Sequence, residues 1–139
     1  MSTDLRQHII GTYLNLRFGM ALMAALFPMV LWLGGLSEGV SLQSSMSIYY
    51  YQGNGALRDI FVGILVAIGA FLYLYKGYNN MENIALNMAG LFAIGVAIFP
   101  TEYNCVTDCS KVTVHKSCAV LFFCVLPMSP SFAPPIRYR

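Results

Sequence analysis

This sequence contains few charged residues. Only 10% of its 139 residues carry a charged side chain, and the formal net charge is +2 with no run of Lys or Arg. A nucleic-acid surface needs clustered basic side chains, so we expect no nucleic acid among the partners. Hydrophobic residues make up 58% of the chain, which lies above the usual range of soluble globular domains. These figures indicate a membrane protein whose first partner is the lipid bilayer.

The usual motifs of catalysis and cofactor binding are also missing. The sequence has no phosphate-binding P-loop, no glycine-rich nucleotide fingerprint, no His-Glu-x-x-His pair and no nucleophile elbow. The topology inferred below places His8 and His115 on opposite sides of the membrane, which leaves too few ligands for a catalytic zinc. The three longest apolar stretches contain no charge, which argues against an ion-coupled transporter. We therefore expect no cofactor and no metal.

Long uncharged stretches are what the sequence does contain. Three of them approach the roughly 20 helical residues that cross a hydrocarbon core, and a fourth begins near Ser117. The fourth helical stretch has about fifteen residues and spans about 22 Å, which is short of a core of roughly 30 Å. The tail at 127–139 is rich in proline and prevents a helical continuation. The predicted helices lie at about 14–36, 57–75, 82–99 and 112–126.

These helices predict an all-α fold, a small transmembrane bundle in which 1–139 form one domain. Three helices are expected to cross the membrane, and the short fourth either crosses or inserts in part. Residues 1–17 are expected to form a short helix at the headgroup level or to remain solvated. Pro28 should bend the first helix. The proline-rich tail stands where a longer apolar helix would be expected, which suggests a truncated or altered C-terminus.

Small residues predict where the helices touch. The second predicted helix has Gly63, Ala67 and Ala70 along one face, and the short connection after it forces an antiparallel hairpin. Asn87 lies deep enough in the third helix that it should hydrogen-bond across the bundle. Alanine recurs every four residues on that helix, at Ala85, Ala89, Ala93 and Ala97.

The distribution of Lys and Arg predicts an orientation. The bias favours both termini on the cytoplasmic side. The loop at 37–57, Arg58, Asp59, Glu102 and His115 then fall together on the outer side. The basic residues assigned to the inner side are Arg6, Arg17, Lys76, Arg137 and Arg139, and those assigned to the outer side are Arg58, Lys111 and Lys116.

The outer face gathers polar groups that allow two interpretations. A catalytic interpretation uses Ser47 or Ser45 as nucleophile, and His115 as general base. Asp59 would orient the histidine. A structural interpretation needs only that Arg58 and Asp59 mark the depth at which the second helix enters the membrane. Because charged flanks of spanning helices are common, the sequence favours the structural interpretation.

Three successive tyrosines, Tyr49, Tyr50 and Tyr51, interrupt the outer loop. Tyrosine has an apolar ring and a hydroxyl that needs a polar partner, so the simplest interpretation is an anchor at the membrane interface. The alternative is a stacking platform that binds a lipid headgroup or a sugar. In that case Arg58 and Glu102 would be further candidate binding residues.

Cys105 and Cys109 lie in a polar loop after the third helix. Together with His115 they give a C-x3-C-x5-H pattern, which matches no common zinc site. A small disulfide between the two cysteines is the favoured interpretation if the loop faces an oxidising compartment.

Several runs of the sequence together resemble a known family. They are SMSIYYY, RDIFVG, YLYKGY, AIGVAIFPTE and VHKSCAVLFF, which cover most of the chain from Ser45 to about Cys124. These runs resemble uncharacterised bacterial integral membrane proteins of the domain of unknown function 998 type. The resemblance implies a small helical bundle in the bacterial inner membrane and supplies no catalytic residues.

The sequence therefore predicts a multi-pass protein of the bacterial inner membrane that acts as a structural or accessory component, rather than as an enzyme. Two alternatives stay open. One is a membrane-embedded lipid hydrolase with Ser47, Asp59 and His115 on the outer face. The other is a subunit that binds a lipid or a protein, where the partner is another membrane protein or a second copy of this chain.

Overall fold

Helices form the whole framework of this protein. The computed structural model describes residues 3–77, 79–101 and 110–126, and every regular element within these ranges is helical. The predicted all-α fold is therefore confirmed. The elements are α1 (Thr3–Ser37), the 3-10 helix η1 (Met46–Tyr51), α2 (Ala56–Leu74), α3 (Asn80–Ile98) and α4 (Ser110–Val125).

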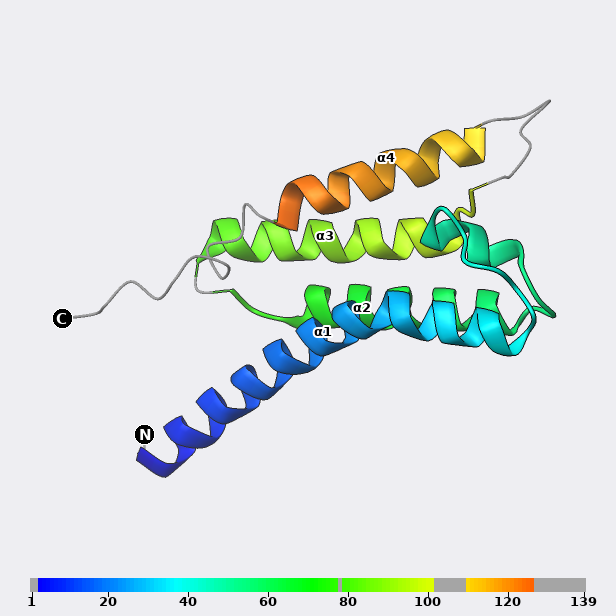
Figure 1. The fold of residues 1–139 in the computed structure, drawn as a ribbon. Coiled ribbons are helices and arrows are strands. Elements are labelled where there is room, and N and C mark those ends of the chain that lie inside the picture. The colour runs from blue at the N-terminus through cyan, green and yellow to red at the C-terminus, as the bar shows by residue number, and fades with distance from the viewer. Residues whose placement is uncertain (1–2, 78, 102–109, 127–139) are drawn as a thin grey trace.

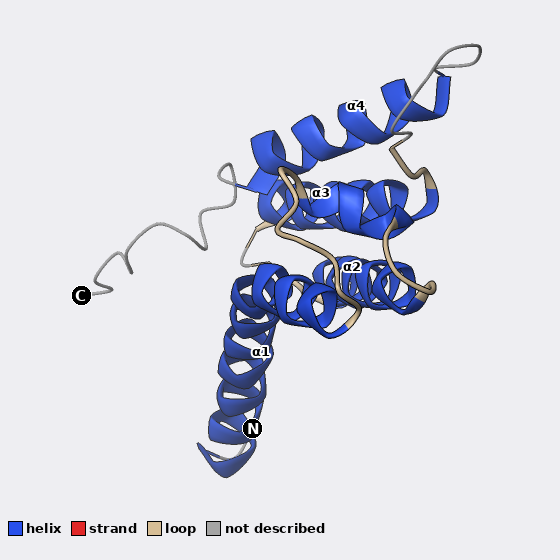
Figure 2. Cartoon of the chain, turned by 45° about the vertical axis from the view of Figure 1, so that its right-hand side comes forward, coloured by secondary structure: helices blue, strands red, loops and turns tan. Residues whose placement is uncertain are grey.

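The bundle is layered around an antiparallel pair. Figure 1 shows α2 and α3 side by side and antiparallel, with α4 lying along α3 on the side away from α2. The C-terminal half of α1 packs along α2, and the short helix η1 lies near the end of the bundle where α1 finishes (Figures 1 and 2). Leu31 of α1 and Leu57 of α2 are completely buried and belong to one core cluster with Tyr49 of η1.

The first helix is longer than predicted. Its predicted start is at about residue 14, whereas α1 begins at Thr3 and continues for 35 residues. The early polar side chains, such as Gln7 and Asn15, are exposed on the helix surface, and the Thr12 hydroxyl donates to the His8 carbonyl at 3.0 Å. Nothing in this stretch breaks the helical backbone, so it extends the spanning helix and forms no separate element. The other three predicted α-helices agree with the structure within two residues at each end.

A bend takes the N-terminal half of α1 away from the bundle (Figures 1 and 2). Pro28 lies inside this helix and has no N–H for the carbonyl one turn earlier, which explains the predicted bend. The helix ends at Ser37, and Gly39, two residues later, has a left-handed φ of 71°. The N–H of Val40 then donates to the Gly35 carbonyl at 2.8 Å, a bond that closes the last turn.

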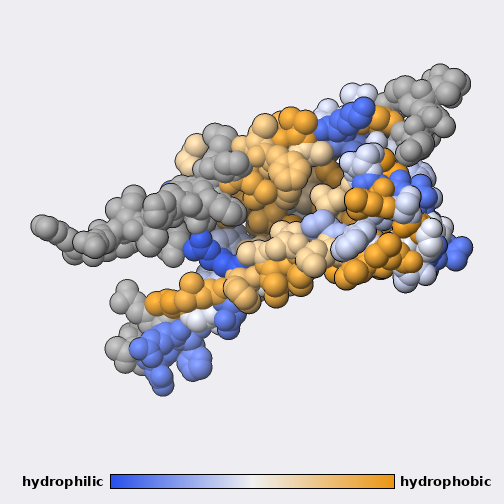
Figure 3. All heavy atoms as spheres, viewed as in Figure 1, coloured by the Kyte–Doolittle hydropathy of each residue, from blue (hydrophilic) through white to orange (hydrophobic). Residues whose placement is uncertain are grey.

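Within the described residues, three helices are long and apolar enough to cross a membrane. They are the segment Gln7–Ser37 of α1, the whole of α2 and the whole of α3. On the face drawn in Figure 3, apolar side chains cover the middle of the molecule and hydrophilic ones gather towards its ends. The fourth helix has 16 residues, or about 24 Å, so its predicted shortness is also confirmed.

The contact between α2 and α3 is a close approach of two backbones. A Cβ atom added to Gly69 would lie 2.7 Å from the carbonyl oxygen of Gly90, and one added to Gly90 would lie 2.6 Å from the carbonyl oxygen of Gly69. The predicted antiparallel packing is thus confirmed, but the predicted face of α2 is wrong. Gly63 and Ala70 are exposed, and the residue of α2 that approaches α3 closely is Gly69. On α3, the predicted face is confirmed at its buried alanines, Ala89, Ala93 and Ala97.

Asn87 does not have the role predicted from its depth. Its side chain is half-buried on α3 and makes no hydrogen bond to another residue that the structure describes. The close approach of α2 and α3 is instead made by glycine and alanine, which bring no side-chain hydrogen-bonding groups into the contact. The proline-rich tail at 127–139 lies outside the described residues.

Candidate functional site at the Ser47–His115 pair

The 3-10 helix η1 holds Ser47 in place. Ser45 caps this helix, and its hydroxyl oxygen accepts the Ser47 backbone N–H at 3.3 Å. Two residues further on, Tyr49 is 3% exposed and its hydroxyl oxygen accepts the Gln43 N–H at 3.3 Å. Gly35 of α1 leaves space for this ring, since a Cβ atom there would lie 2.7 Å from Tyr49 Cε1. A buried tyrosine therefore fixes η1 against α1.

His115 reaches Ser47 from the opposite side of the bundle. The imidazole projects from α4 and is 5% exposed, and its Nε2 lies 3.0 Å from the Ser47 hydroxyl oxygen. The other ring nitrogen, Nδ1, lies 2.7 Å from the carbonyl oxygen of Phe99, just beyond α3. The Ser47 hydroxyl, the His115 imidazole and the Phe99 carbonyl thus connect η1, α4 and the end of α3 through two hydrogen bonds.

The partners of His115 determine which nitrogen carries the proton. A carbonyl oxygen only accepts hydrogen bonds, so Nδ1 must donate to Phe99. In the neutral imidazole this leaves the lone pair on Nε2, which then accepts the hydroxyl proton of Ser47. A hydroxyl that donates to an oriented imidazole is the arrangement in which a serine can be activated as a nucleophile.

An apolar cavity of about 280 Å³ adjoins this pair. Ser47 and His115 both line it, and the rest of its wall is almost entirely apolar. Side chains from every helix contribute, among them Phe27 of α1, Phe61 of α2 and Phe122 of α4. The cavity is thus a space inside the bundle with polar groups at one position, close to the lower size limit of sites that hold small ligands.

Asp59 takes no part in this arrangement. Its carboxylate pairs with the neighbouring Arg58 guanidinium at 3.1 Å, and the side chains of the two residues are 73% and 50% exposed, respectively. The sequence-based interpretation assigned Asp59 to orient His115, but in the structure the Phe99 carbonyl makes that contact. Arg58 and Asp59 instead form an exposed ion pair in the first turn of α2.

The three tyrosines of η1 have three different surroundings. Tyr49 is buried in the core, and Tyr50 packs edge-on against Phe61 with ring centroids 6.2 Å apart. Only Tyr51 is exposed, at 43%. The structure therefore presents one open tyrosine ring rather than a platform of three. Glu102, Cys105 and Cys109 lie outside the described residues.

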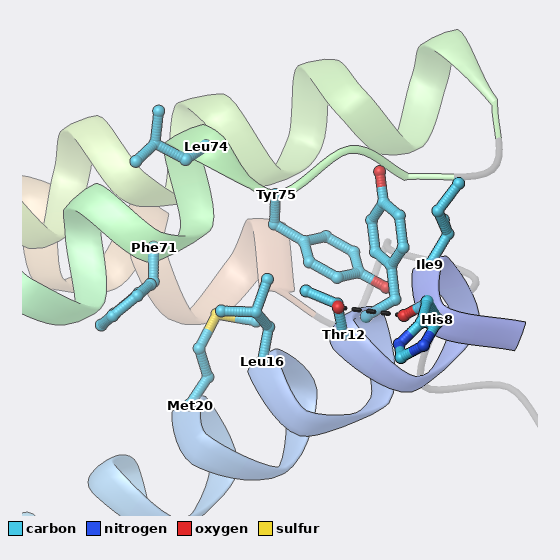
Figure 4. A pocket seen from close by; sticks show the side chains of 9 residues that line it. His8, Ile9, Thr12, Leu16, Met20, Phe71, Leu74 and Tyr75 are labelled. Atoms are coloured by element: carbon cyan, nitrogen blue, oxygen red, sulfur yellow. Dashed lines mark hydrogen bonds between the residues drawn. The ribbon is translucent and has the colours of Figure 1, made fainter. Parts of the chain in front are cut away.

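A larger hollow, of about 480 Å³, lies between the N-terminal half of α1 and the end of α2 (Figure 4). Tyr13 and Tyr75 meet edge-on in it, with ring centroids 5.6 Å apart. Its Thr12 hydroxyl donates to the His8 carbonyl of the same helix, so this group is used within α1 (Figure 4). The hollow is larger than the cavity beside Ser47 and His115, but no serine–histidine pair is among the described residues that line it. The described residues also contain no group of three side chains suited to hold a metal ion.

Sequence reasoning identified Ser47 and His115 as candidates but not the group that orients the histidine. The two residues lie 68 positions apart, and only the folding of α4 onto α3 brings them together. The orienting group is a backbone carbonyl, which every residue type carries, so the type of residue 99 does not reveal it. A signal that was available is the position of Phe99 beside Pro100, since helices usually end before a proline.

No protein-family model, no curated protein and no solved structure matches this chain.

Proposed function

We propose that this chain is a multi-pass membrane protein that binds the acyl chain of a lipid in the cavity beside Ser47 and His115. The observation that carries this proposal is an apolar cavity of about 280 Å³ with a single polar position in its wall. An acyl chain ending in an ester or acid has the same distribution of apolar and polar groups. Four of the lining residues, Ala24, Pro28, Met46 and Phe123, are exposed, so a lipid can approach the cavity from the surrounding bilayer.

The binding proposal is tested with a fatty acid that carries a photoreactive diazirine on its chain. After illumination of the purified protein in lipid nanodiscs, we expect crosslinks on cavity residues such as Phe61 and Phe122. The variant Ala24→Phe fills the cavity from α1 and should lower this labelling. Ala70→Phe is the matched control, because Ala70 is exposed on α2 and does not line the cavity. Crosslinks that are spread over the outer surface and unchanged by Ala24→Phe would overturn the proposal.

A structural or accessory role is the second candidate, and a specific observation favours it. The hydrogen bonds of His115 connect α4 to η1 and to the end of α3, so they fasten α4 to the rest of the bundle. A purely structural pair predicts that Ser47→Ala lowers the melting temperature, while wild-type protein gives no cavity crosslinks with the photoreactive fatty acid.

The location proposed for the protein is the bacterial inner membrane, with the N-terminus in the cytoplasm. The distribution of Lys and Arg supports this orientation, and the likeness to the domain of unknown function 998 type supports the compartment. Single cysteines introduced by Asn54→Cys and Lys76→Cys, with the native cysteines replaced, test it. A membrane-impermeant maleimide added to intact cells should label position 54 and not position 76. The reverse pattern would contradict the proposed orientation.

A further inference from the structure

We infer that Ser47 and His115 are the nucleophile and the general base of a hydrolase that cleaves fatty acyl esters of lipids. This inference rests on the proposed function, because the cavity must hold the acyl chain so that its ester carbonyl lies at Ser47. The geometry that points to it is a serine hydroxyl 3.0 Å from an imidazole nitrogen, on the wall of an apolar cavity. A serine–histidine pair with a purely structural role would not need an apolar cavity beside it.

The hydrogen bonds of His115 set the direction of proton transfer. Nδ1–H is held by the Phe99 carbonyl at 2.7 Å, which leaves Nε2 as the only ring nitrogen that can accept the Ser47 proton. Phe99 thus acts as a positioning residue through its backbone, in the place where a carboxylate stands in the Ser-His-Asp arrangement. His115 is 5% exposed, so its ring is held in the bundle and is pre-oriented before a substrate binds.

The reaction has two balanced halves. In the first, Ser47 Oγ bonds to the ester carbonyl carbon as its proton passes to His115 Nε2, and the bond to the alcohol oxygen breaks as that oxygen takes the proton. In the second, a water molecule gives a proton to His115 Nε2 and its oxygen bonds to the acyl carbon. The bond to Ser47 Oγ then breaks, Oγ recovers the proton, and the fatty acid leaves.

Water can reach this position from the loop side. Ser44 and Ser45 precede Ser47 in the chain and are both exposed. The acyl chain lies in the apolar cavity, whose wall includes Ser47. The serine is therefore at a boundary between a lipid-like space and an exposed loop, as the hydrolysis of a lipid ester requires.

The test uses an alkyl fluorophosphonate, a reagent that bonds covalently to activated serines, on the full chain in nanodiscs. Wild-type protein should be labelled at Ser47, as identified by mass spectrometry. Ser47→Ala should remove the label, and His115→Gln should slow labelling by about 100-fold or more, the range lost with a general base. Ser44→Ala is the matched control, since Ser44 is exposed and outside the pair. Asp59→Asn should also label at the wild-type rate, because Asp59 pairs with Arg58.

The diazirine crosslink separates this inference from the proposed function. Cavity crosslinks in wild-type protein and in Ser47→Ala, combined with no fluorophosphonate label on wild-type Ser47, would overturn the hydrolase and leave the lipid-binding function standing. Equal labelling rates of wild-type and His115→Gln protein would also overturn it. If wild-type protein gives no cavity crosslinks, the proposed function fails, and this inference fails with it.

Discussion

Single glycines determine how closely the parts of this protein approach one another. Gly69 and Gly90 bring the backbones of α2 and α3 together, and Gly35 admits the ring of Tyr49. Gly63 is different, because a Cβ atom added there would have no neighbour within 4 Å. Glycine is therefore required at some helical positions of this chain and not at others, although the sequence presents them alike.

This difference predicts opposite outcomes for one substitution. Gly69→Ala places a methyl group against the Gly90 carbonyl, a backbone atom, so the helices must separate. We expect the free energy of unfolding to fall by about 1–3 kcal/mol, as in other overpacked cores. Gly63→Ala should leave it unchanged or raise it by up to about 1 kcal/mol, since alanine favours helix. Unfolding by SDS titration in detergent micelles measures both, and equal losses would contradict the prediction.

At the scale of the element, α3 depends on the residue that caps it. The side-chain oxygen of Asn79 accepts the Glu82 N–H at 2.7 Å, which satisfies one of the N–H groups left without a partner at the start of the helix. Glu82 is itself 1% exposed, so the first turn of α3 contributes a buried side chain to the bundle. The capping bond therefore stabilises a turn that carries a buried side chain, which a cap at a frayed helix end does not.

The cap predicts a measurable contrast between two neighbouring asparagines. Asn79→Ala removes the capping bond and should lower the free energy of unfolding by about 1 kcal/mol. Asn80→Ala, in the next position, changes an exposed side chain that caps nothing, so its effect should be much smaller. Thermal unfolding of the two variants in the same detergent provides the comparison. A loss in Asn80→Ala that matches the loss in Asn79→Ala would show that the cap does not matter.

The helices of this chain could be predicted well, because long uncharged stretches have few alternatives in a membrane. The contacts between the helices were harder to predict. Alanine every four residues identified the face of α3, but α2 has small residues on more than one face, and the pattern selected Gly63 where the structure uses Gly69. Of the candidate site, the sequence supplied Ser47 and His115. It could not supply the Phe99 carbonyl, since a backbone group leaves no trace in residue type.

At the scale of the whole molecule, α4 is attached to the bundle mainly through α3. It packs on α3, where Gly95 makes room for Cys118, whose Sγ would lie 2.8 Å from a Cβ atom at that position. It meets η1 through His115. The candidate site therefore exists only while α4 stays on α3.

This dependence predicts that a change on α3 will release α4. Gly95→Val should push Cys118 away and raise its rate of reaction with a maleimide by about 5–30-fold, if the substitution costs one or two kcal/mol. The other three cysteines are replaced by serine so that only Cys118 reports. Gly63→Val is the control, because Gly63 is exposed and a Cβ atom there would have no neighbour within 4 Å. An unchanged rate in Gly95→Val would mean that α4 tolerates the added side chain where it lies.

The bent helix α1 has a consequence for how the protein meets bilayers of different thickness. At about 1.5 Å per residue, its 35 residues measure about 52 Å, whereas the 19 residues of α2 or α3 measure about 28 Å. The α2–α3 pair is held together at the Gly69–Gly90 contact, so its length matches a hydrocarbon core of one thickness. Only 17% of the membrane-spanning stretch of α1 is buried, against 39% of that of α3. Because α1 is less enclosed by the bundle, it is the helix that can change its tilt to relieve hydrophobic mismatch. We expect the hollow between α1 and α2 to widen or narrow as it does so.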